Sequence, residues 1–152
     1  MTKNNLTLEN EENDYDKHVD FYYANLINSL ILFSLTTVEL EKLQGHAFDP
    51  LFELESEIDY AFTAVCFETI FRNERIDDSL REELLYFKQE TNNIPSNVWD
   101  WEFIDTHPNW IAVRHRANKL LERLGVTTRR YNDAFITIHD NKGNIMQKGG
   151  KV

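Results

Sequence analysis

Cysteine and glycine are scarce in this chain of 152 residues, which has one cysteine, Cys66, and five glycines. A lone cysteine excludes an internal disulfide and a metal site built from several cysteines, and it fits a reducing compartment. None of the glycines belongs to a phosphate-binding loop or a dinucleotide-binding turn. The composition therefore disfavours nucleotide-dependent enzymes.

The sequence also lacks a long apolar run. Its most apolar stretch, residues 26–35 (LINSLILFSL), is about half as long as a membrane-spanning helix, and three polar side chains interrupt it. Residues 1–18 do not contain the basic region followed by an apolar region that marks a secretory signal. We therefore expect no membrane association and a cytoplasmic protein.

Recognisable catalytic and metal-binding motifs are missing as well. The sequence contains neither H-E-x-x-H nor E-x-x-H, which are the usual helical ligand pairs for zinc or a di-iron centre. It has no G-x-S-x-G nucleophile elbow, and its five histidines are scattered. These absences predict no catalytic residue, no metal and no cofactor. An enzyme stays open as an alternative, because groups that converge only in space are invisible in a sequence.

Apolar residues recur at helical spacing along most of the chain. From Tyr15 to Phe33 they return every three or four positions, which is typical of an amphipathic helix. Capping residues and prolines mark the boundaries of further segments, such as Asp49 before Pro50. The predicted helices cover residues 14–33, 36–45, 49–71, 77–94 and 108–125. Because apolar groups spread round the whole circumference in its second half, the 49–71 helix is predicted to be the central one.

The end of the chain has a different pattern. Residues 134–146 combine the alternating stretch AFITIH with a DNKGN turn, which predicts a small β-hairpin. We expect residues 1–12 to be a flexible N-terminus, 13–146 one domain and 147–152 a flexible tail. The fold class is predicted to be mainly α, a single-domain helical bundle of about five helices with a small C-terminal β-hairpin.

Basic residues are scarce in the first three-quarters of the chain. Residues 1–113 hold 23 acids and 7 bases, whereas residues 114–152 hold 3 acids and 9 bases, and the net charge is -10. Residues 43–71 contain six acids and neither lysine nor arginine. Such a run is usually a solvated helix face near an N-terminus. The alternative is a negative surface that attracts a basic partner.

The acids of the predicted 49–71 helix fall into two bands on a helical wheel. Glu53 and Glu57 share one band with Glu68, whereas Glu55 and Asp59 flank the apolar stripe on its other side. We predict that Glu53, Glu55, Glu57 and Asp59 supply the electrostatic attraction.

The basic residues near the C-terminus form the stripe Arg116, Lys119 and Arg123, followed by Arg129 and Arg130. The charge disfavours nucleic acid as a ligand, since the whole chain is acidic and a phosphate-binding footprint normally dominates the local field. The bases are expected to neutralise the protein's own acidic helices or to meet a second copy, which leaves a homodimer open.

All three tryptophans lie close together, and two belong to the segment VWDWEFID, residues 98–105. In an extended conformation Trp99 and Trp101 would face one side, and Asp100 and Glu102 the other. One interpretation is an aromatic slab that closes the helical core. The other is an exposed anchor for a partner, since interface energy concentrates in tryptophan and tyrosine.

A small, acidic, aromatic-rich helical protein without catalytic motifs resembles the bacterial immunity proteins, which neutralise secreted toxins. The resemblance is carried by the acidic run 49–68 and the WDWEFID segment, and it transfers no residue. It implies a non-enzymatic inhibitor that binds a basic partner stoichiometrically, a nuclease-type toxin being one candidate. The partner-binding residues predicted for it are Glu53, Glu55, Glu57, Asp59, Trp99, Asp100, Trp101 and Glu102. The alternatives are a small-ligand-binding or enzymatic helical domain, and a self-associating structural or regulatory module.

Overall fold

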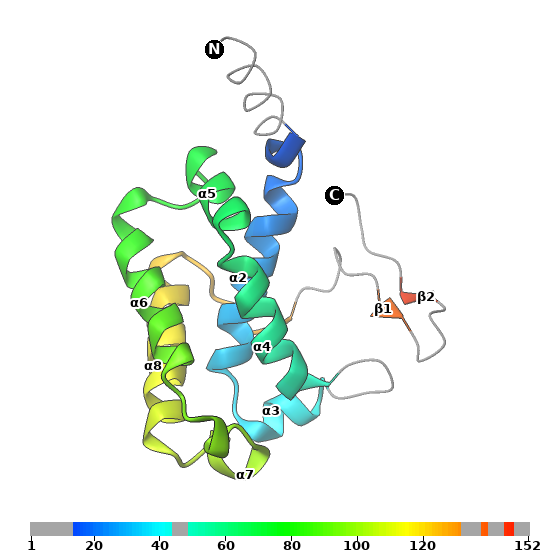
Figure 1. The fold of residues 1–152 in the computed structure, drawn as a ribbon, viewed down its shortest axis with the longest axis vertical. Helices are drawn as coiled ribbons and strands as arrows, with labels where there is room; N and C mark the ends of the chain where they lie inside the picture. Colours follow the sequence, from blue (N-terminus) through cyan, green and yellow to red (C-terminus); the bar gives the residue numbers. More distant parts are fainter. Residues whose placement is uncertain (1–13, 44–48, 132–137, 140–144, 148–152) are drawn as a thin grey trace.

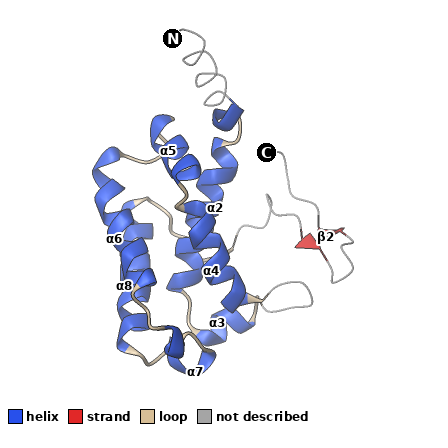
Figure 2. Cartoon of the chain, in the orientation of Figure 1, coloured by secondary structure: helices blue, strands red, loops and turns tan. Residues whose placement is uncertain are grey.

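A computed structural model describes residues 14–43, 49–131, 138–139 and 145–147. Its helices are α2 (Val19–Ser34), α3 (Thr37–Glu41), α4 (Pro50–Ala61), α5 (Ala64–Arg72), α6 (Arg81–Asn92), α7 (Trp101–Ile104) and α8 (Pro108–Arg123), with single 3-10 turns at Asp78–Leu80 and Ser96–Val98. The chain is mainly helical, as predicted, with α4 and α8 running alongside α2 and α6 packed against α8 (Figures 1 and 2).

Helix α2 lies at the centre of the bundle, where it packs against α4, α5 and α8. Residues 21–38 contain no charged side chain, so every face of this helix can be covered. Its two serines hydrogen-bond within the helix: Ser29 donates to the Leu26 carbonyl at 2.7 Å and Ser34 to the Ile31 carbonyl at 2.6 Å. The prediction that the 49–71 helix is central was therefore wrong.

The predicted 49–71 helix is in fact two helices, because the chain turns at Phe62 and Thr63. Thr63 adopts an extended backbone, and its hydroxyl donates to the Tyr60 carbonyl at 2.8 Å, which competes with a continuing helix. The turn brings Phe62 onto Phe67, with ring centroids 5.2 Å apart. The apolar residues that surround the predicted helix thus belong to two helices with separate buried faces.

The predicted helix boundaries at residues 36, 49 and 125 are confirmed, whereas the one at residue 45 lies outside the described residues. Thr36 and Glu39 form a capping box at α3, and the Asp49 side chain accepts the Leu51 N–H at 3.1 Å at the start of α4. Gly125 has φ +76°, and the backbone N–H of Val126 returns to the Leu121 carbonyl at 2.9 Å, which closes α8.

The tryptophan segment is not extended, which corrects the predicted alternation of its faces. Asp100 accepts the N–H of Trp101 at 2.7 Å, so that α7 begins immediately after it. Trp110, at the start of α8, is 3% exposed and donates its indole N–H to the Val98 carbonyl at 2.8 Å. This hydrogen bond fixes the segment that precedes α7 onto the core.

Replacing Trp110 with phenylalanine is expected to destabilise the protein by about 2 kcal/mol, because it leaves the Val98 carbonyl without its buried donor and opens a small cavity. The matched control is Trp101→Phe, at a half-buried ring. Urea unfolding followed by circular dichroism measures both variants. Equal losses in the two would contradict a special role for the Trp110 hydrogen bond.

The strands β1 (Ile138–His139) and β2 (Ile145–Gln147) pair antiparallel, and all of their residues except Gln147 fall in the predicted hairpin segment. Most of residues 134–146 lies outside the described residues, so the hairpin as a whole stays a prediction. Of the segments predicted to be flexible, residues 1–12 and 148–152 also lie outside them, whereas Gln147, the first residue of the predicted tail, is the last residue of β2. No helix in the described part of the chain is long and apolar enough to cross a membrane.

Candidate functional site

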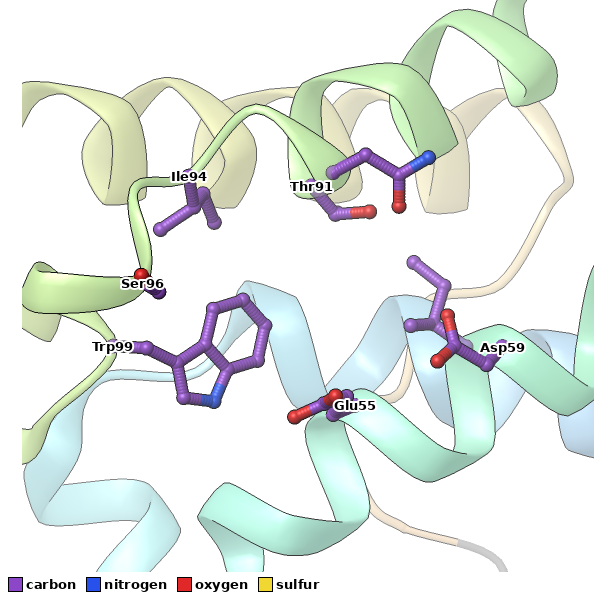
Figure 3. A pocket seen from close by; sticks show the side chains of 8 residues that line it. Glu55, Asp59, Thr91, Ile94, Ser96 and Trp99 are labelled. Atoms are coloured by element: carbon purple, nitrogen blue, oxygen red, sulfur yellow. The ribbon is translucent and has the colours of Figure 1, made fainter.

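A groove of about 450 Å³ lies between α4 and the segment from the end of α6 to Trp99 (Figure 3). Helix α4 supplies two carboxylates and an isoleucine to it, and the opposite side supplies small polar groups, an isoleucine and an indole. The lining residues are Glu55, Ile58, Asp59, Thr91, Asn92, Ile94, Ser96 and Trp99. No arginine or lysine is among them.

The two carboxylates of the groove lie one helical turn apart on α4. Ile58, only 2% exposed, anchors this face of the helix to the core beside them. Asp59 accepts a hydrogen bond at 3.0 Å from Lys88, which also donates to Asn92 at 2.6 Å. Glu55 is exposed and forms no hydrogen bond or ion pair with any described residue. Once Lys88 is matched to Asp59, the groove keeps one carboxylate in excess.

The opposite side of the groove is the C-terminal end of α6, where Thr91 and Asn92 form the last residues of the helix. The carbonyl groups of a helix C-terminus carry a partial negative charge, and cations near it are stabilised. The last turn of α6 has no basic residue. Both sides of the groove therefore favour a positively charged group.

Trp99 closes one end of the groove. Its ring lies 4.8 Å from Trp110 and 6.3 Å from Phe33, centroid to centroid, which fixes its position from behind. The side chain is half-buried, and Figure 3 shows the indole projecting into the space beside Glu55. Its N–H donates to no acceptor in the described part of the chain. The groove thus presents an aromatic surface next to the unmatched carboxylate.

Glu57 lies on the other side of α4, and the structure corrects its assignment to an exposed acidic surface. The side chain is 7% exposed, and Oε1 accepts a hydrogen bond from the Tyr131 hydroxyl. Oε2 is buried without a partner among the described residues. Burial raises the pKa of Glu57 to about 8, although the Tyr131 hydrogen bond opposes the rise and the nearby Glu53 adds to it.

The other predicted site residues lie outside the groove lining. Glu53 shares the buried side of α4 with Glu57, and burial, helped by Asp49, raises its pKa. Asp100 caps α7, Trp101 packs half-buried against the core, and Glu102 is exposed on α7. The structure therefore brings together Glu55, Asp59 and Trp99, and leaves the remaining five elsewhere.

Many acids outside the groove are matched to bases of the same chain. The bases of α8 pair with acids of neighbouring segments, as in Arg114 with Asp105, Arg116 with Glu90 and Arg123 with Glu83. The expectation that the C-terminal bases neutralise the protein's own acids is confirmed for Arg116 and Arg123, and Arg114 adds a pair that was not predicted. The predicted negative surface is therefore smaller than expected, because bases of the same chain pair with many of its acids. At the groove, Glu55 is the acid without such a partner among the described residues.

Sequence reasoning missed the residues that α6 and the following turn contribute, among them Thr91, Asn92 and Ile94. They stand in a polar stretch, TNNIPS, whose only local signal is the proline that ends the helix. Their role comes from tertiary packing, which places the end of α6 opposite α4.

No group of three or more histidine, cysteine, aspartate or glutamate side chains is arranged to hold a metal ion in the described ranges. No known protein family, curated protein or solved structure matches this chain. The residues of the groove are therefore the basis for a functional assignment.

Proposed function

We propose that this chain is a non-enzymatic binding protein that captures a basic segment of a partner protein in the groove between α4 and α6. The main support for this proposal is that a half-buried tryptophan, an unmatched carboxylate and a helix C-terminus line the same groove. No cation is among the lining residues. Stoichiometric inhibition of a basic toxin domain, as by an immunity protein, is the function we infer from this surface.

The charge of the groove favours a basic protein over a nucleic acid. Glu55 and Asp59 would repel phosphates, whereas base-stacking sites on nucleic-acid-binding proteins are surrounded by basic residues. An aromatic ring beside acids is the composition expected of an anchor for a cationic side chain. The attraction also speeds the encounter with a basic partner.

Co-expression tests this proposal. The products of the genes that flank this one in its genome of origin are expressed in a bacterial host, each alone and each together with this chain. We expect one of them to arrest growth alone, to be harmless together with this chain, and to co-purify with it in a complex of equal stoichiometry by light scattering. The proposal is wrong if no flanking product both arrests growth and forms such a complex.

A small organic cation is a second candidate ligand, since a groove of about 450 Å³ lies within the volume range of small-molecule sites. A flanking gene product that chemically modifies such a cation, in place of a toxin, would favour this alternative.

A further inference from the structure

We propose that the groove is a binding site for an arginine side chain, with the guanidinium between Glu55 and the ring of Trp99 and the methylene stem against Ile58 and Ile94. This inference rests on the proposed function, because the arginine would belong to the basic partner. It assigns a chemical identity to the group that the groove recognises.

The arginines within this fold show which groups surround a guanidinium in this protein. In three places among the described residues, one guanidinium both pairs with a carboxylate and lies over an aromatic ring. Arg75 pairs with Asp20 and lies 4.5 Å from the Tyr23 ring centroid. The other two examples are Arg81 with Glu68 and Phe71, at 4.3 Å from the ring, and Arg116 with Glu90 and Tyr86, at 4.5 Å.

Glu55 and Trp99 offer the same two components across the groove (Figure 3), and no arginine is among the described residues that line it. The carboxylate is exposed and unmatched in the described structure, and the ring is held from behind by Trp110. A guanidinium from outside would complete the arrangement that this chain makes internally. The end of α6 adds its partial negative charge from the facing side.

The shape of the site favours arginine over lysine. A guanidinium is planar and weakly hydrated, so it stacks on an indole and against apolar walls such as Ile58 and Ile94. An ammonium is a compact, strongly hydrated point charge, and the groove already holds one at its edge: Lys88 lies between Asp59 and Asn92. The space beside Trp99 therefore suits the flat cation.

The test is a nuclear magnetic resonance titration of the full-length protein with the capped tripeptide Ac-Gly-Arg-Gly-NH2. Matched peptides carry lysine, or citrulline as the neutral shape analogue. We expect the arginine peptide to shift the Trp99 indole resonance and the backbone amides of 55–59 saturably. The lysine peptide should bind about threefold or more weakly, and the citrulline peptide should cause no saturable shift.

Variants locate the binding site and separate its components. Glu55→Gln should weaken the arginine peptide about fivefold, whereas Glu102→Gln, which removes an exposed acid outside the groove, should not change its affinity. Trp99→Leu, followed through the backbone amides, should abolish the preference for arginine over lysine. Lys88→Met should strengthen binding, because it frees the Asp59 carboxylate.

Equal affinities for the arginine and lysine peptides, or for the arginine and citrulline peptides, would overturn the inference. So would an unchanged affinity in Glu55→Gln. If the peptides fail in this way while the co-expressed complex forms, only the arginine site is wrong. If the arginine peptide binds as expected but no flanking product forms a complex, only the proposed function is wrong.

Discussion

Replacing Glu57 with glutamine is expected to stabilise the protein at pH 8 by about 4 kcal/mol and to leave its stability at pH 4 nearly unchanged. The buried carboxyl accepts the Tyr131 hydroxyl through one oxygen, and the other oxygen has no partner among the described residues. A carboxylate in that position loses its hydration, so the folded protein holds the proton. Glutamine is neutral at every pH and keeps an oxygen that accepts from Tyr131.

The expected direction follows from the two pKa values of Glu57, which are about 8 in the folded protein and 4.5 for the unperturbed side chain. Below pH 4.5 both states hold the proton, and the contribution of the protonated carboxyl to stability is fully present. As the pH rises toward 8, the unfolded chain ionises while the folded protein does not, so wild-type stability falls by at most about 1.4 kcal/mol per pH unit. Glu57→Gln does not lose stability in this way, because glutamine does not ionise.

Asp16 and Asp77 contribute with the opposite sign and Glu53 with the same sign as Glu57, but all three are common to both proteins. Hydrogen bonds from Arg72 and Asn73 hold the pKa of Asp16 below its ordinary value, and the backbone N–H of Ser79 does the same for Asp77. Their stabilisation is lost as the pH falls, in wild type and variant alike. The difference between the two unfolding curves therefore isolates Glu57.

Urea unfolding of the wild type, Glu57→Gln and the exposed control Glu55→Gln, measured from pH 4 to pH 9, checks this prediction. We expect the Glu57→Gln curve to separate upward from the wild type with rising pH, while Glu55→Gln follows the wild type. Parallel curves for the wild type and Glu57→Gln would show that the buried carboxyl does not retain its proton on folding.

Replacing Glu55 with lysine is expected to slow association with the basic partner about tenfold or more at low ionic strength. The change converts the one excess carboxylate of the groove into an excess cation, next to the ring that we propose as the anchor for the partner. Because attraction acts mainly on the encounter, dissociation should change less than association. Salt screens the effect, so the two association rates should converge at high ionic strength.

A charge swap supplies the matched control. Asp59→Lys combined with Lys88→Asp exchanges the two ends of an existing ion pair and keeps the net charge of the groove. Stopped-flow tryptophan fluorescence measures all three proteins with the co-purified partner. The double variant should associate at nearly the wild-type rate. Equal rates for Glu55→Lys and the wild type at low salt would contradict electrostatic capture at this groove.

The parts of the fold that were predictable from sequence rest on local signals. The capping box at Thr36, the start at Asp49 and the end at Gly125 each involve residues a few positions apart. The turn at Thr63 was missed, because its apolar neighbours fit one continuous helix equally well. The central position of α2 was missed as well, since a sequence shows that a helix can be buried but not which neighbours cover it.

The candidate site was also only partly predictable from sequence. The helical wheel separated Glu55 and Asp59 from Glu53 and Glu57, and the structure places these two pairs on different sides of α4. Which side is covered depends on Tyr131, 74 residues beyond Glu57, and no local pattern announces that contact. Trp99 lines the groove, but it does not belong to an extended segment as predicted, because Asp100 starts a helix directly after it.

Hydrogen exchange of this chain, free and bound to its partner, tests the central claim most directly. We expect slower exchange in the bound state at residues 52–59 of α4 and at 91–99, the two sides of the groove, and little change at 115–130. Protection confined to 115–130, with both sides of the groove exchanging as in the free protein, would show that the partner binds elsewhere.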